Sequence, residues 1–267
     1  MTHIHVLDQY QEGSSLVHRL DPRVKLILTL AFIVVATAMP HGVWLSFLLL
    51  LLGVGFIIAA SRTDPLIILK RSMLALPFAL VAVTLVFTTN GATLFTFKLA
   101  SLSVSITDQG IIAFASILTK AWLAVLMATL LSATTTFPEL LSAMRAIRIP
   151  RVIVSIVSFM YRYIFVIAEE ALRLQRAKEA RSANPHGDRR GSLLWRAKVL
   201  GGMIGSLFLR SYERSERIYA AMLSRGFDGR MRTMKAEGLQ STDVIVSTAL
   251  VGYLLVVVAL AVVPTWD

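Results

Sequence analysis

The sequence has no cysteine among its 267 residues. This absence excludes disulfide bonds, thiolate metal sites, cysteine nucleophiles and iron–sulfur clusters held by cysteine. Charged residues are also scarce, at 16% against roughly 25% in ordinary soluble domains. Acidic residues and histidine are almost missing from the long apolar runs, so a membrane-embedded enzyme would lack its acid, base or metal ligands. Together with 56% hydrophobic residues, these shortages indicate a membrane protein that is not an enzyme.

The charge that is present is strongly basic and unevenly placed. The net charge of +11 comes mostly from short basic blocks between apolar runs. A nucleic-acid-binding protein would need a soluble basic domain, and no segment has that composition. In a membrane protein such blocks mark the cytoplasmic side. We therefore expect a lipid bilayer and no nucleic acid as partner.

Several apolar runs are candidates for membrane-spanning helices, which need roughly 20 residues. Five spans are predicted at about residues 24–39, 43–60, 73–89, 110–133 and 244–263. The run 151–168 is also apolar, but if it crossed fully, the basic stretch after it would lie outside. We expect it to pack against the other helices, or to dip in and run out to the cytoplasm. The predicted fold is all-α and polytopic, with five to seven membrane helices and long cytoplasmic helices.

The charge distribution orients these spans. With a cytoplasmic N-terminus, the basic blocks near residues 19–25, 62–71 and 145–151 all fall on the cytoplasmic side. The turn 40–42 and the connection 90–109 then lie outside, where the weakly alternating stretch 95–107 is expected to be extended or to lie at the interface. Lys120 sits inside the fourth run, and we expect it to face an interface or the bundle interior.

The chain is expected to have three parts: membrane helices at 1–150, a membrane-to-cytoplasm helix with cytoplasmic helices at 151–235, and a last membrane helix at 236–267. Two polar helices lie in the middle part. The first should end before Asn184-Pro185, which are strong helix breakers. The second should end at Gly226, a residue suited to the left-handed conformation that stops a helix.

Both polar helices end on an arginine between small residues. One tip is Ala180-Arg181-Ser182 and the other is Ser224-Arg225-Gly226. Arginines are common at helix C-termini, where they complement the helix dipole. A short side chain on each side also lets a partner's backbone approach while the guanidinium meets a carboxylate bidentately. The residues alone leave both interpretations open.

The sequence resembles a known family of membrane proteins over most of its length. The resemblance rests on five blocks in order: HRLDPRVKL at 18–26, FPELLSAMRAIRIPR at 137–151, FMYRYIFVIAEE at 159–170, EARS at 179–182 and RSYERSERIYAAMLSRGFDG at 210–229. The chain looks like the transmembrane T component of energy-coupling factor (ECF) transporters, of the cobalt/nickel type called CbiQ or NikQ.

This resemblance implies a coupling subunit of ATP-driven cobalt or nickel ion uptake in the bacterial cytoplasmic (inner) membrane. Such a subunit has no cofactor and no metal site of its own. Its implied partners are two ABC-type ATPase subunits, similar to CbiO or NikO, and a substrate-capturing membrane subunit, similar to CbiM or NikM. In the family, two Ala-Arg-Gly-like signatures end the coupling helices that dock on the ATPases. Carried over, the docking arginines are Arg181 and Arg225, and Ser182 departs from the usual glycine.

Two alternatives stay open at this point. One is a T component of an ECF vitamin transporter, because the subunit that chooses the substrate lies elsewhere. The other is a stand-alone secondary transporter, which would need a binding site near the middle of the membrane, often between inverted repeats. No repeat is visible in the sequence, and uptake that persists without an ATPase would favour this second alternative.

Overall fold

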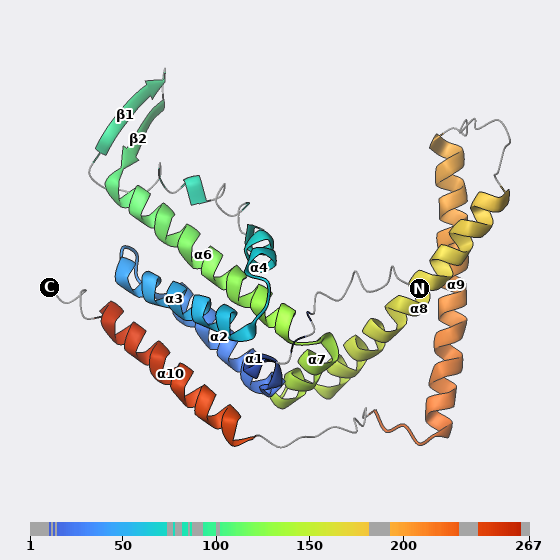
Figure 1. Ribbon diagram of the computed structural model, residues 1–267. Coiled ribbons are helices and arrows are strands. Elements are labelled where there is room, and N and C mark those ends of the chain that lie inside the picture. Colours follow the sequence, from blue (N-terminus) through green and yellow to red (C-terminus); the bar gives the residue numbers. More distant parts are fainter. Residues whose placement is uncertain are drawn as a thin grey trace. The chain divides into compact units, whose positions relative to one another are not determined.

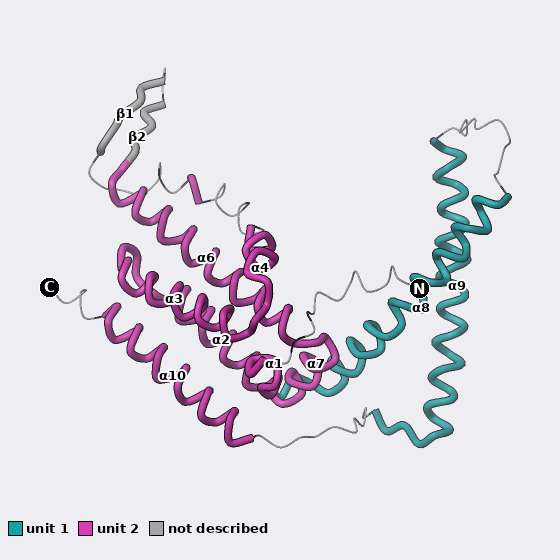
Figure 2. Tube along the Cα trace, viewed as in Figure 1, with its two compact units in different colours: residues 1–4, 147–236 teal, residues 5–146, 237–267 magenta. Residues whose placement is uncertain are grey.

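The structure, a computed structural model, divides into two compact units, which Figure 2 colours separately. Unit 1 comprises residues 1–4 and 147–236, and unit 2 comprises residues 5–146 and 237–267. The structure describes residues 11, 13, 15–73, 77, 82–84, 86, 93–99, 102–181, 193–229 and 240–262.

Unit 2 is a bundle of helices with one β-hairpin (Figure 1). Its elements are α1 (Leu16–Arg19), α2 (Pro22–Ala38), α3 (Trp44–Ser61), α4 (Pro65–Ser72), β1 (Thr93–Leu99), β2 (Leu102–Thr107), α6 (Asp108–Thr134), α7 (Phe137–Ala146) and α10 (Ser241–Val262). Helices α3, α6 and α10 confirm three of the five predicted spans, and α2 is a shorter helix over the first of them. The fifth, at 73–89, lies almost entirely outside the described residues. Strands β1 and β2 pair antiparallel, so residues 95–99 and 102–107 of the stretch are extended, as one of the two expectations had it.

Two helix starts in unit 2 have side-chain caps formed by near neighbours in the chain. The Asp21 carboxylate accepts a hydrogen bond from the Arg23 backbone N–H at 2.8 Å, and Pro22 opens α2. At the start of α7, the Glu139 carboxylate accepts from the Thr136 backbone N–H at 3.1 Å. Gly42 has a φ of 87°, which lets the chain reverse between α2 and α3 in a short turn. These starts could be read from the sequence because they involve neighbours in the chain.

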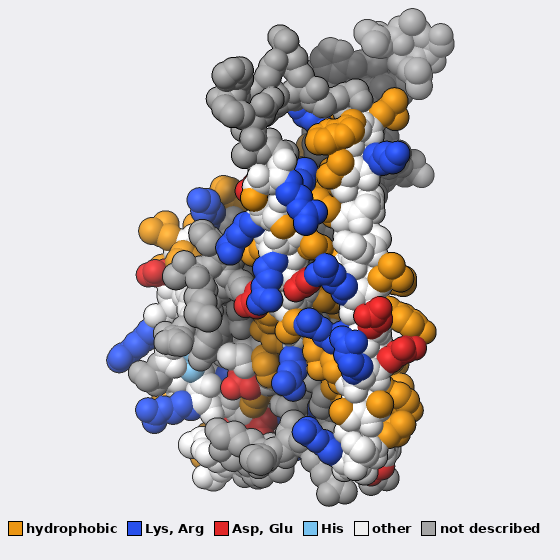
Figure 3. All heavy atoms as spheres, turned by 90° about the vertical axis from the view of Figure 1, so that its right-hand side faces the viewer, with side chains coloured by type: hydrophobic (Ala, Val, Ile, Leu, Met, Phe, Trp, Pro, Cys, Tyr) orange, Lys and Arg blue, Asp and Glu red, His pale blue; other side chains and the backbone are white. Residues whose placement is uncertain are grey.

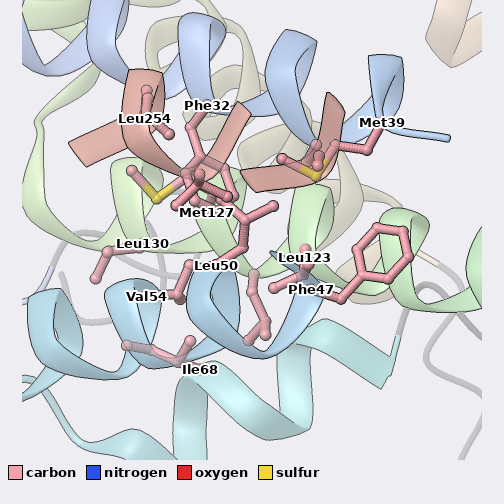
Figure 4. Packing of buried hydrophobic residues seen from close by; sticks show 14 residues of the cluster. Phe32, Met39, Phe47, Leu50, Val54, Ile68, Leu123, Met127, Leu130 and Leu254 are labelled. Atoms are coloured by element: carbon pink, nitrogen blue, oxygen red, sulfur yellow. The ribbon is translucent and has the colours of Figure 1, made fainter. Parts of the chain in front are cut away.

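The hydrophobic core of unit 2 lies where α2, α3, α4, α6 and α10 meet (Figure 4). Phe32, Leu50, Leu123 and Val257 are at most 2% exposed, and each belongs to a different helix. One polar pair in this bundle joins two helices: the Trp122 indole N–H donates to the Ser72 hydroxyl at 2.9 Å. Such pairing matters in an apolar setting, where a lone polar group costs several kcal/mol.

Four helices in the described part of the chain are long and apolar enough to cross a bilayer: α3, α6, α8 (Arg151–Arg181) and α10. Helix α2 has 17 residues and is about 26 Å long at 1.5 Å per residue. That length is slightly short of the roughly 30 Å hydrocarbon core. The protein is therefore a polytopic α-helical membrane protein.

A cluster of buried, hydrogen-bonded polar groups around Lys25 and Asp243, the Lys25 cluster, joins several helix ends at one end of unit 2. The Lys25 ammonium donates to the backbone carbonyls of His18 at 3.0 Å and Thr134 at 3.1 Å, although Lys25 is only 7% exposed. The Asp243 carboxylate accepts from the backbone N–H of Asp21 at 3.0 Å and of Gln240 at 2.9 Å. The first turns of α2 and α10 are therefore tied to each other and, through Lys25, to the last residue of α6.

Lys120 closes the opposite end of the same bundle. Its ammonium donates to the carbonyls of Thr37, at 3.2 Å, and of Met39, which lie at the end of α2. Nearby, the Gly42 backbone N–H donates to the Ser116 hydroxyl at 3.1 Å. A cation on the orphan carbonyls of a helix C-terminus is well placed electrostatically. Lys120 was expected at an interface or facing the bundle interior, and in the structure it caps a neighbouring helix of the bundle.

Candidate docking site on the crossed helices

Unit 1 is built around two long helices, α8 and α9 (Leu193–Ser224). Helix α8 has 31 residues and α9 has 32. The apolar run 151–168 and the polar stretch that follows it form one uninterrupted helix, which ends at Arg181 before the predicted breakers. The absence of glycine and proline between residues 151 and 181 permits this continuity.

An ion pair marks the place where the two helices cross. The Arg210 guanidinium on α9 donates to the Glu170 carboxylate on α8 at 2.6 Å. The Glu170 side chain is 18% exposed and the Arg210 side chain 58%. Glu170 also lies 3.9 Å from Arg173 one turn along α8, and Arg173 lies 3.8 Å from Glu169. The Glu170 carboxylate at the crossing thus has one cationic partner on α9, Arg210, and a second on its own helix, Arg173.

The C-terminal tip of α9 has the backbone geometry that its sequence predicts. Gly226 has a φ of 74°, the left-handed conformation that glycine adopts without steric cost. The Gly226 N–H donates to the Leu223 carbonyl and the Phe227 N–H to the Met222 carbonyl, both at 3.0 Å. This pair of backbone hydrogen bonds is the Schellman motif. The helix therefore ends sharply at Ser224, and Arg225 follows it at the surface.

The residue after this stop returns to α8. The Phe227 ring meets the Phe159 ring edge-on, with centroids 6.5 Å apart and planes at 73°. Aromatic pairs in this arrangement contribute beyond simple area burial. The tip of α9 is thereby held against the first half of α8.

The C-terminal tip of α8 carries the other predicted arginine. Ala180 and Arg181 are exposed and end the helix, while Ser182 lies outside the described residues. Ser224, Arg225 and Gly226 are also exposed at their tip. Within the part of the chain that the structure describes, neither the Arg181 nor the Arg225 guanidinium has a hydrogen bond or an ion pair. Both arginines are exposed.

The two tips lie at opposite ends of the helix pair (Figure 1). At 1.5 Å per residue, Arg181 lies about 16 Å beyond the crossing along α8, and Arg225 about 22 Å beyond it along α9. The structure thus places the two arginines on one helix pair but keeps them apart. This arrangement suits two separate docking contacts and cannot form one composite site.

Two spaces flank the crossing. On one side lies an apolar cavity of about 260 Å³ between the first half of α8 and the second half of α9. On the other lies an open groove of about 800 Å³ that reaches Arg181 and Trp195. Glu170 and Arg210 are the residues that line both. On the face in Figure 3, Lys and Arg side chains are spread among exposed hydrophobic ones, so this surface is basic and partly apolar.

Sequence reasoning found the tips but missed the crossing. Both members of the Glu170–Arg210 pair lie inside blocks that carry the family resemblance, yet 40 positions separate them. Local rules predict the pairs Glu169–Arg173 and Glu213–Arg217, and the structure confirms both at 3.8 and 3.9 Å. A pair between two helices depends on how they pack, which the spacing within either helix does not encode.

Comparison with known proteins decides the family. The model of the CbiQ cobalt transport protein family matches residues 13–235, which include both arginine tips and most of both units but not helix α10. The chain belongs to the CbiQ family. CbiQ proteins are transport components of membranes, so this chain is a membrane transport component and not itself an enzyme.

Relatives of this CbiQ family member carry related names. It is 28% identical over 236 residues to the energy-coupling factor transporter transmembrane protein EcfT of Listeria innocua, covering 84% of this chain and 85% of the relative. It is 27% identical over 198 residues to the cobalt transport protein CbiQ of Rhodobacter capsulatus, covering 69% and 79%. A putative fused cobalt transport protein CbiMQ of Methanocorpusculum labreanum is 29% identical over 244 residues, covering 88% of this chain and 38% of the relative.

Proposed function

We propose that this chain is the transmembrane coupling subunit of an ATP-driven cobalt or nickel ion uptake transporter of the ECF type. The observation that carries the proposal is the pair of exposed arginines at opposite tips of one crossed helix pair, in a member of the CbiQ family. Each tip would dock on one ABC-type ATPase subunit, and movement of the ATPases would pass through α8 and α9 to the membrane.

The docking chemistry follows from the tips. A guanidinium that enters a partly dry acidic groove makes charge-assisted hydrogen bonds worth about 1.5–3 kcal/mol each. Ala180 and Ser182 flank one arginine, and Ser224 and Gly226 flank the other, so a partner's backbone can come close at both. The substrate-capturing membrane subunit, similar to CbiM or NikM, is the third partner. The fused relative whose name joins CbiM to CbiQ supports this partnership.

The distribution of charge supports a cytoplasmic N-terminus. The Lys25 cluster marks one end of unit 2. The first residues of helix α2 and the last residues of α3, α6 and α7 lie there. The basic residues Arg19, Arg23, Arg62 and Arg145 belong to these helix ends. The positive-inside rule assigns such an end to the cytoplasm. We accordingly propose a multi-pass protein of the bacterial cytoplasmic membrane, with membrane parts at 1–150 and 236–267 and the coupling part at 151–235.

Charge reversal at each tip tests the docking. Arg181→Glu and Arg225→Glu replace an attractive contact by like-charge repulsion, and loss of one partner of a buried pair alone costs about 3–5 kcal/mol. We expect both variants to reach the membrane, to lose co-purification of the ATPase subunits and to lose metal uptake. Arg176→Glu on α8 and Arg217→Glu on α9 are matched controls away from the tips, and they should retain both activities.

Normal co-purification and normal uptake in both tip variants would overturn the proposal. Radioactive cobalt and nickel, together with a vitamin panel, would separate the metal transporter from a vitamin-type T component. Uptake that persists in cells without the ATPase subunits would instead indicate a stand-alone secondary transporter.

A further inference from the structure

The Glu170–Arg210 ion pair lies between the apolar cavity and the open groove that flank the helix crossing. Both residues line the apolar cavity on one side and the open groove on the other. Unfilled space above and below the pair means that side-chain packing is sparse at this level of α8 and α9. A short charge-assisted bond of 2.6 Å at such a place constrains how the two helices cross.

From this placement we propose that Glu170 and Arg210 form the pivot of the helix pair, a positioning contact that sets the crossing angle and hence the spacing of the two arginine tips. The inference rests on the proposed docking function. Because the tips lie about 16 and 22 Å from the crossing, a rotation of about 10° moves them by about 3 and 4 Å. A displacement of that size exceeds the tolerance of a bidentate hydrogen bond.

Glu170 is built to serve this role, and its neighbour Glu169 is not. Glu170 is mostly buried and reaches across to α9, with Arg173 on its own helix as a second cation. Glu169 is 50% exposed and lies near Arg173 on the same helix. The two acids therefore offer a matched comparison. The same substitution can be made at these adjacent positions, but only Glu170 makes an ion pair with the other helix.

The experiment measures the angle directly on the full chain. Because the sequence has no cysteine, Ala177→Cys on α8, which lines the groove, and Ala197→Cys, an exposed position on α9, carry spin labels without other reactive thiols. These positions lie about 10 and 20 Å from the crossing, so a rotation of about 10° moves them by about 2 and 3 Å. Pulsed electron paramagnetic resonance of the purified protein in lipid nanodiscs then reports the distance distribution.

We expect Glu170→Ala and Arg210→Ala each to broaden or shift this distribution, and Glu169→Ala to leave it unchanged. The double variant should resemble either single one, because both remove the same contact. Arg210→Lys, which keeps the charge, should restore much of the original distribution. A distribution in Glu170→Ala that matches the one in Glu169→Ala would overturn the pivot.

Co-purification of the ATPase subunits with the same variants, without labels, separates this inference from the proposed function. The pivot predicts that Glu170→Ala weakens ATPase capture severalfold while Arg181 and Arg225 are intact. If the distances change and capture is normal, although Arg181→Glu abolishes it, the positioning role is wrong. If Arg181→Glu and Arg225→Glu leave capture intact, the docking function fails, whatever the distances show.

Discussion

Replacement of Asp243 by alanine should destabilise the membrane bundle, because this one carboxylate ties the starts of two helices that are far apart in the sequence. Asp243 is 3% exposed and accepts from the backbone N–H groups of Asp21 and Gln240. Alanine leaves both donors without their charged acceptor. The bond to Gln240 is partly replaced by water, since Gln240 is exposed, whereas the bond to Asp21 joins α10 to α2 and has no local substitute.

The size of the effect follows from these two bonds. Hydrogen bonds to charged groups contribute about 1.5–3 kcal/mol each, so with solvent at Gln240 the total loss should be about 3 kcal/mol. For a domain of this size that loss lowers Tm by about 6–12 °C. Asp243→Asn keeps one acceptor oxygen and should lose about half as much.

Thermal unfolding of the purified full chain in detergent, followed by tryptophan fluorescence, measures this loss. Thr242→Ala is the matched control, since Thr242 is the exposed neighbour on the same turn and should change Tm by less than about 2 °C. The reasoning is refuted if Asp243→Ala unfolds at the same temperature as Thr242→Ala.

Two further predictions concern the ends of the same bundle. Burial lowers the pKa of His18, partly opposed by its bond to the Gln11 carbonyl, so the folded state favours neutral imidazole. The resulting stabilisation is complete above about pH 6.5 and is lost as the pH falls through the lowered pKa; Tm should therefore fall more steeply on acidification in the wild type than in His18→Gln, and equal slopes would contradict this. Lys120→Met leaves the Thr37 and Met39 carbonyls without their donor and should cost about 1–2 kcal/mol. Its Tm should lie below that of Thr119→Val on the same turn, and equal values would argue against capping.

Much of the helical structure could be predicted because its signals are local. The apolar runs fixed α3 and α10 within a few residues, Asp21 and Pro22 fixed the start of α2, and Gly226 fixed the end of α9. Each signal depends on neighbours within one or two turns. The pairing of β1 with β2 was harder, since weak alternation fits both an extended strand and an interfacial segment.

Contacts between distant segments could not be predicted in the same way. The sequence near Lys25 does not predict that its ammonium reaches the end of α6. The sequence near Asp243 likewise does not predict that its carboxylate joins α10 to α2. Lys120 was expected to face an interface or the bundle interior, but its partners at the end of α2 became visible only from the packing. These bonds arise where helix ends meet, and the lengths and packing of whole helices decide where that is.

The sequence by itself determined a membrane protein of the CbiQ type with two small-residue arginine tips, because composition, charge blocks and helix stops are properties of short segments. Only the tertiary structure decided that the C-terminal tips of α8 and α9 lie at opposite ends of one crossed pair, and that Glu170 meets Arg210 where the helices cross. The physical reason is that a helix fixes its own ends through bonds within three or four residues, whereas its partner and crossing point follow from side chains that meet across 40 positions of chain.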